Sequence, residues 1–184
     1  TFLLRTALPP ITSSEGRRVT ELRRMGMRIV IELEGELFLV LHLMVAGRLR
    51  WLTPGGKLPG RITLAVFEFD SGWLVFTEAG TRKRASLHLG EGEAALAALD
   101  PGGVEALDIA EGEFARRLTA GNHTLKRALT DPHAFSGIGN AYSDEILHRA
   151  RLSPIALTQK LKPDEIGRLH RAVRDVLAEW TARL

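Results

Sequence analysis

The chain carries two kinds of hydrophobic periodicity, one after the other. From Arg17 to about Leu89 the apolar runs are short, rich in β-branched residues and separated by turn sequences such as Glu34–Gly35. From Glu113 onward apolar residues recur at helical spacing, most regularly over residues 162–184. Strands that precede helices, instead of alternating with them, indicate an α+β protein whose strands and helices lie in separate lobes.

Turn and capping signals place the individual elements. We expect strands over residues 27–34, 36–43, 46–51, 61–69 and 72–78, and an edge strand over 82–89. We expect helices over residues 91–100, 113–121, 124–131, 140–150 and 162–184. The predicted domains are therefore a β lobe over 1–90, a linker with one short helix over 91–112, and a helical lobe over 113–184.

The composition excludes several classes of protein. Hydrophobic residues make up 45% of the 184 residues, as in a folded chain, and no apolar run approaches the ~20 residues of a membrane helix. The chain has no cysteine, and its six histidines show no HxH or HExxH spacing. We therefore expect a cytoplasmic protein with no membrane contact, no disulfide, no metal site and no cofactor.

Positive charge is concentrated in the helical half. Residues 115–184 carry 12 Lys and Arg against 7 Asp and Glu, whereas residues 1–114 carry 13 against 15. Such an excess suits a surface that binds phosphates, although charge alone would favour a solvated basic helix face instead. The motif at residues 135–149 favours the phosphate-binding interpretation.

This motif reads FSGIGNAYSDEILHR. Gly137 and Gly139 have no Cβ, so another molecule can approach the backbone closely. Asn140 can cap the helix that follows, and the free N–H groups of a helix N-terminus form a natural phosphate site. Tyr142, the acidic pair Asp144–Glu145 and the apolar residues after it make the pattern more specific than a glycine pair alone.

The segment resembles the helix-two-turn-helix core of the formamidopyrimidine-DNA glycosylase/endonuclease VIII family, which repairs DNA by base excision. The resemblance extends upstream to LKRALTD, which contains Lys126 and Asp131, and to strands within residues 16–51. It implies a β-sandwich lobe and a helical lobe that hold duplex DNA containing a damaged base or an abasic site between them. The damaged base must be flipped out of the duplex, because its glycosidic bond is inaccessible inside the stack.

The resemblance also implies roles for individual residues. Lys126 and Asn140 are expected to bind the phosphates that flank the damaged nucleotide, with the glycine loop and Tyr142 beside them and His42 near the DNA backbone. Met44 or Val45 is expected to fill the space left by the flipped base. Glu145 is expected near the active site. The alternatives are that Asn140 only caps its helix, that Glu145 stabilises a first helical turn, and that His42 is structural. Asp131 is expected to structure the turn between the two helices.

Three features depart from the family pattern. The family's N-terminal proline nucleophile and the glutamate after it are absent from the opening TFLLRTALPP. Met27 occupies the position of a lysine that supports elimination, and the adjacent Arg28 stays protonated and is a poor proton shuttle. The cysteines of the zinc finger that many members carry are also absent. We expect a fragment of a longer enzyme that binds DNA without supplying the nucleophile.

Three functions remain open at this point. The first is a DNA glycosylase with lyase activity at abasic sites, acting as a monomer on oxidised bases in the bacterial nucleoid. The second is a DNA-binding relative without catalysis, which Met27 favours. The third is an RNA-binding protein, since a ribosomal small-subunit protein has a similar motif with a GIG loop; the resemblance over residues 16–51 argues against it.

Overall fold

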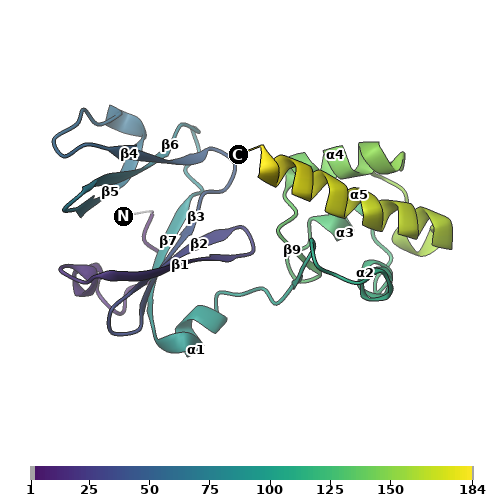
Figure 1. The fold of residues 1–184 in the computed structure, drawn as a ribbon, viewed down its shortest axis with the longest axis horizontal. Coiled ribbons are helices and arrows are strands. Elements are labelled where there is room, and N and C mark those ends of the chain that lie inside the picture. Colours follow the sequence, from purple (N-terminus) through teal and green to yellow (C-terminus); the bar gives the residue numbers. More distant parts are fainter. Residues whose placement is uncertain (1–2, 184) are drawn as a thin grey trace. The chain divides into compact units, whose positions relative to one another are not determined.

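The computed structural model describes residues 3–183, which divide into two compact units with the boundary between Leu99 and Asp100. Strands are the main regular elements of the first unit, and helices are those of the second (Figure 1). The α+β class predicted from the order of the two periodicities is therefore confirmed, and each unit has its own hydrophobic core.

The first unit contains two antiparallel sheets. The four-stranded sheet has the order β1 (Val19–Met25), β2 (Arg28–Leu33), β3 (Leu37–His42) and β7 (Ser86–Glu91). The three-stranded sheet has the order β4 (Gly47–Leu52), β6 (Gly72–Glu78) and β5 (Thr63–Phe69). Two short 3₁₀ helices, Ile11–Ser14 and Gly60–Ile62, lie in the connections.

Alternation along the strands gives the four-stranded sheet two different faces. Leu39, Leu41 and Leu89 point inward and pack with Phe76 of the other sheet. On the outer face, Val30, Phe38 and Val40 pack with Leu96 of the short helix α1 (Gly92–Ala97). Burial of the inner face against the second sheet fixes the register, because a slip of one residue would expose every core side chain.

The strand predicted over residues 82–89 is shorter and better covered than expected. It begins at Ser86, and its outer edge is partly paired, since Leu87 donates its N–H to the carbonyl of Leu3 and Arg5 donates to the carbonyl of Leu87. Residues 79–85 instead form a loop. The predicted hairpin around residues 70–72 is confirmed, with Phe69 opposite Gly72.

The second unit contains four α-helices within the described residues: α2 (Glu111–Leu118), α3 (Leu125–Leu129), α4 (Asn140–Ala150) and α5 (Pro163–Ala182). The short strands β8 (Val104–Glu105) and β9 (Phe135–Ser136) pair in parallel, and a 3₁₀ helix covers Thr158–Lys160. The core lies among these elements and includes Phe114, Leu129, Phe135, Ile146 and Leu169.

Helix α5 shows why the sequence signal for it was strong. Pro163 is its first residue, Asp164 and Glu165 lie in its first turn, and the Glu165 carboxylate accepts the N–H of Lys162 at 2.8 Å. The predicted apolar stripe packs into the core, with Leu169 and Val173 fully buried and Ile166, Leu177 and Trp180 partly buried. The stripe is therefore a packing surface, as predicted.

Candidate nucleic-acid interface

The two glycines of the loop between β9 and α4 have different backbone conformations. Gly137 has φ +88°, a left-handed conformation that favours glycine. Ile138 is buried in the core of the unit and fixes the loop to it. Gly139 is extended, with φ −97° and ψ 174°, so its backbone conformation does not require glycine. A residue without Cβ at position 139 also lets another molecule approach the backbone closely.

Within residues 3–183, no side chain caps the start of helix α4. Gly139 is the N-cap, Asn140 is the first helical residue, and no side-chain cap is formed. The expectation that the Asn140 side chain caps the helix is therefore wrong, because Asn140 lies one position too far along. The exposed Asn140 amide and the first N–H groups of α4 are left as donors at the positive end of the helix dipole.

Lys126 of α3 lies against α4. Its Nζ is 2.5 Å from Oδ1 and 2.6 Å from Oδ2 of Asp144, and both side chains are partly exposed. Asp144 follows Asn140 by four residues, so the two lie on the same face of α4. The structure therefore brings Lys126 to the side of α4 that carries Asn140, as a phosphate site shared by these residues requires.

The acidic and aromatic residues of the motif have other surroundings. Glu145 lies beyond the first turn of α4, which contains no acidic residue, so helix-dipole stabilisation does not account for it. Tyr142 is half-buried, and its ring centroid lies 5.8 Å from that of Trp180 in α5. Asp131 structures the turn after α3, as expected, since its Oδ1 accepts the N–H of His133 at 2.9 Å.

In the first unit, two loops lie side by side at the ends of neighbouring strands. Gly47 at the start of β4 pairs with Glu78 at the end of β6, so loop 43–46 and loop 79–85 emerge at the same edge. Loop 43–46 is tight, with the N–H of Gly47 donated to the carbonyl of Leu43 at 2.9 Å and Met44 at φ +55°. The Met44 side chain is 41% exposed and that of Val45 77%. Met44 and Val45, the two residues predicted to fill the space of a flipped base, therefore lie at the exposed tip of loop 43–46.

A buried carboxylate holds the second loop. Glu78 is only 2% exposed, and its two carboxylate oxygens accept the N–H groups of Arg84 at 3.0 and 3.1 Å and of Ala85 at 3.3 Å. Lys83 also donates to the backbone carbonyl of Glu78. These bonds fold residues 79–85 into a compact basic loop beside Met44 and Val45.

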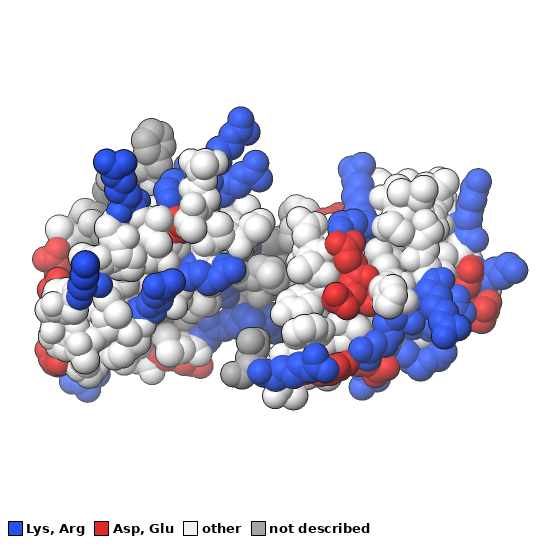
Figure 2. All heavy atoms as spheres, turned by 90° about the horizontal axis from the view of Figure 1, so that it is seen from above, with Lys and Arg blue, Asp and Glu red and all other residues white. Residues whose placement is uncertain are grey.

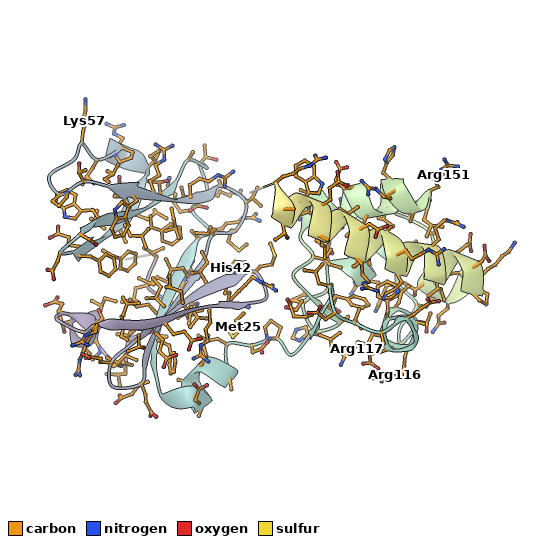
Figure 3. All side chains as sticks on the ribbon, viewed as in Figure 1. Met25, His42, Lys57, Arg116, Arg117 and Arg151 are labelled. Carbon is orange, nitrogen blue, oxygen red and sulfur yellow. The ribbon has the colours of Figure 1, made fainter. Side chains whose placement is uncertain are left out.

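His42 lies at the end of β3, where Figure 3 labels it. Burial and the neighbouring Arg28 guanidinium lower the pKa of His42, with a smaller effect of His88. Arg28 is directly opposite His42 across the β2–β3 ladder. Met27 lies just before Arg28 in the β1–β2 turn and is 50% exposed, so the lysine position of the family pattern is at the surface here.

Charged side chains cover both units. Figure 2 shows Lys and Arg side chains on the visible face of each unit, with Asp and Glu side chains among them. No helix within residues 3–183 is long and apolar enough to cross a membrane. In the same residues, no three His, Asp or Glu side chains are grouped so that they could share a metal ion.

Comparison with known proteins assigns both units. Residues 6–87 match the formamidopyrimidine-DNA glycosylase N-terminal domain, and residues 100–182 match the formamidopyrimidine-DNA glycosylase H2TH domain. The chain belongs to the formamidopyrimidine-DNA glycosylase family. The resemblance inferred from the GIGN motif and from residues 16–51 is thereby confirmed, and the match of the β unit removes the basis for the ribosomal alternative.

Individual family members agree with this assignment. The formamidopyrimidine-DNA glycosylases of Chloroflexus aurantiacus and Thermus thermophilus are 34% and 36% identical to the chain over 167 and 173 residues, covering 89% and 90% of it. The solved structure of the MutM (Fpg) protein from Thermus thermophilus has a TM-score of 0.80 at 34% identity and covers 96% of the chain. The chain spans 59–61% of the length of these two curated relatives and 63% of that structure.

A more distant structure confirms the fold alone. MutM in complex with DNA containing carbocyclic 8-oxo-G has a TM-score of 0.83 at 22% identity, covering 91% of this chain and 63% of that one.

Three features of the site were not predicted from the sequence. Asp144 was expected only as part of an acidic pair, yet it binds Lys126 across 18 residues of chain. The role of Glu78 could not be predicted, because an acidic residue at a strand end is common. Its burial depends on how residues 79–85 fold. The surroundings of His42 depend on strand order, which the sequence pattern does not specify.

Proposed function

We propose that this chain is the DNA-binding part of a base-excision repair glycosylase with lyase activity at abasic sites. Its partner is duplex DNA containing an oxidised base or an abasic site, and the enzyme gains access to the base by flipping it from the duplex. Family membership supports this proposal, as do the relatives solved with DNA containing an 8-oxoguanine analogue or an abasic site.

The observation that carries the proposal is the arrangement at the start of α4. The free N–H groups of the helix, the exposed Asn140 amide and the Lys126 ammonium lie on one side of α4, next to a glycine that leaves the backbone accessible. This arrangement combines neutral donors, a positive helix end and a cation, which together suit a phosphate group. Tyr142 contributes by positioning α4 against α5.

The first unit supplies a complementary function. The exposed Met44 and Val45, on a tight loop beside the basic loop 79–85, are suited to enter a gap left by a flipped base. A loop that is held rigidly loses little conformational freedom on binding, so its apolar side chains can stabilise an opened duplex. His42 lies at the end of a neighbouring strand and adds a donor for the DNA backbone.

A second candidate function is DNA binding without catalysis. The observation that favours it is Met27, which occupies the family's lysine position and has no group that can transfer a proton. Glu145 is exposed on α4 and is a candidate for a supporting acid in the helical unit. Both candidate functions require the same phosphate site.

Asn140→Asp tests the phosphate site directly. An aspartate at the first helical position favours the helix dipole, so the melting temperature should hold or rise slightly. The new negative charge would face the DNA, so affinity for a duplex with an abasic-site analogue should fall at least ~10-fold, as expected when a charged contact is reversed. Fluorescence anisotropy and thermal unfolding measure the two effects. Equal affinity of variant and parent would remove the phosphate role of Asn140.

A further inference from the structure

The loop that carries Met44 is fixed in shape from within. The Nη1 of Arg48 donates to the backbone carbonyl of Val45 at 3.2 Å and to that of Gly47 at 2.7 Å. A Cβ on Gly47 would lie 2.2 Å from the carbonyl oxygen of Leu43, so only glycine lets the two ends of the loop approach this closely. The backbone of Met44 is therefore held at the tip of the loop.

The conformation of Met44 directs its side chain outward. Its φ of +55° is strained for a residue with a Cβ, and its long apolar side chain is nevertheless 41% exposed. The neighbouring loop 79–85 supports this arrangement, because a Cβ on Gly80 would lie only 3.5 Å from the Cβ of Ala46. A strained backbone that holds an apolar side chain in solvent indicates a residue presented for contact with another molecule.

Methionine differs from other apolar residues in that peroxides oxidise its thioether sulfur to a polar sulfoxide. The chain has three methionines, Met25, Met27 and Met44. Met25 is half-buried and packs against the cluster between α1 and the outer face of the four-stranded sheet. Met27 and Met44 are 50% and 41% exposed, so a dissolved oxidant can reach both. Of these two, Met44 has the proposed role of filling the gap left by a flipped base.

We propose that Met44 is a site of reversible oxidation by hydrogen peroxide, and that its sulfoxide weakens binding to DNA with a gap in the base stack. The inference rests on the proposed function for the DNA that is bound. A lone pair of the sulfur attacks one oxygen of the peroxide, and an S–O bond forms as the O–O bond breaks. The departing oxygen takes the proton of the transferred oxygen and leaves as water. The sulfur is oxidised, the peroxide is reduced, and no further reactant is needed.

Oxidation of Met44 should affect binding but not folding. In the free protein, water hydrates the sulfoxide oxygen at the exposed tip, so the melting temperature should not change. In an opened duplex, the same oxygen would lie among base faces and lose its water. Burial of a polar group without a hydrogen bond is unfavourable, so affinity for a duplex with an abasic-site analogue should fall roughly tenfold. Affinity for an intact duplex should hold, because an intact duplex offers no gap to the side chain.

Peroxide treatment followed by peptide mass spectrometry and DNA titration tests the site. The full chain is treated with hydrogen peroxide, the peroxide is removed, and the oxygen gained by each methionine is quantified. Met27 and Met44 should be oxidised before Met25, and affinity for the abasic duplex should fall in proportion to the Met44 sulfoxide. Methionine sulfoxide reductases A and B, each specific for one sulfoxide epimer, should restore the affinity. Affinity that stayed low after complete reduction would contradict reversible oxidation.

Met44→Leu assigns the effect to one residue. Leucine is apolar and similar in volume but cannot be oxidised, whereas Met25 and Met27 remain in the variant. The comparison is made within the variant, and its affinity for the abasic duplex should be the same before and after peroxide. An equal loss in Met44→Leu and in the parent would overturn the inference, because another residue would then be responsible. Met44→Gln, which is polar at similar length, should reproduce the loss without any oxidant.

The intact duplex separates this inference from the proposed function. If the untreated chain preferred the abasic duplex and oxidation of Met44 left that preference unchanged, the inference would be wrong while the proposed function stood. The same conclusion would follow if Met44 gained no oxygen at a peroxide concentration that oxidises Met27. If the untreated chain bound neither duplex, the proposed function would fail and this inference with it, a result that is seen before any oxidant is added.

Discussion

At the scale of single residues, the Lys126–Asp144 pair shapes the site. In the free protein the Asp144 carboxylate forms an ion pair with the Lys126 ammonium, with 2.5 Å between Oδ1 and Nζ. This pair lies on the helix face where a phosphate is proposed to bind. A phosphate must therefore compete with a carboxylate that is already in place. The pair is partly exposed, so its contribution to folding is small, ~0–1 kcal/mol.

Replacement of Asp144 by asparagine should strengthen DNA binding. The substitution removes the competing charge and its repulsion of phosphate, so affinity should rise about 2–5-fold, the equivalent of an exposed ion pair. The free energy of unfolding should change by less than ~0.5 kcal/mol, as is usual for exposed sites. Equilibrium titration with duplex DNA and chemical denaturation measure both. A weaker complex would mean instead that Asp144 is needed to orient Lys126.

The two loop glycines should separate folding from binding. Gly137→Ala places a Cβ in a left-handed conformation and should destabilise the protein by about 1 kcal/mol. Gly139→Val is compatible with the extended backbone there, so it should cost little stability but block the approach of a phosphate. Denaturation and DNA titration of both variants provide the comparison. If Gly139→Val unfolded the protein and Gly137→Ala did not, the assigned roles would be reversed.

At the scale of elements, α4 is held at both ends by different means. Its start rests on the glycine loop, whereas its end is closed by Arg151 in a left-handed conformation, φ +53°, with the N–H of Leu152 bound to the carbonyl of Leu147 at 3.0 Å. Arg149 also binds Glu179 of α5 at 2.7 Å. The helix that carries the proposed phosphate site is thus fixed in position along its length.

Arg151→Gly should stabilise the helical unit. A left-handed residue with a Cβ is strained by ~1–2 kcal/mol, part of which is offset by the greater freedom of glycine in the unfolded chain. The net gain should be about 0.5–1 kcal/mol, seen as a higher melting temperature. Arg151→Ala is the control, because it removes the charged side chain but keeps the strain, and it should give no gain. Equal stabilisation by Arg151→Gly and Arg151→Ala would show that the effect comes from removal of the positive charge and not from relief of backbone strain.

At the scale of the whole molecule, the sequence predicted the order of the units and most of their elements. Helix α5 was predicted well because Pro163, the acidic first turn and the apolar stripe all indicate the same structure. Strand β1 was not placed by periodicity, since VTELRRM lies at a sheet edge and is mostly exposed, which weakens the alternation of apolar residues.

The parts of the site that could not be predicted are those made by packing. The Lys126–Asp144 contact depends on how α3 lies against α4, and the surroundings of His42 depend on β7 pairing with β3 from 44 residues away. Local patterns do not contain this information. The cap predicted for Asn140 failed for a local reason, because the extended Gly139 takes the N-cap position and moves Asn140 into the helix.

Binding of DNA phosphates by the helical unit is the property on which the proposed function depends most. Each phosphate contact made by a basic side chain releases counterions, so the logarithm of the binding constant falls linearly with the logarithm of the salt concentration. The most direct test is to titrate the parent and Lys126→Ala with several duplexes at a series of salt concentrations. Lys160→Ala, an exposed lysine of the same unit, is the matched control.

If Lys126 binds a phosphate, Lys126→Ala should weaken binding to every duplex alike and make the slope of this plot shallower by ~1, while Lys160→Ala should leave it unchanged. An unchanged slope in Lys126→Ala, with binding lost for only one sequence, would show that Lys126 reads a base and would contradict the phosphate site.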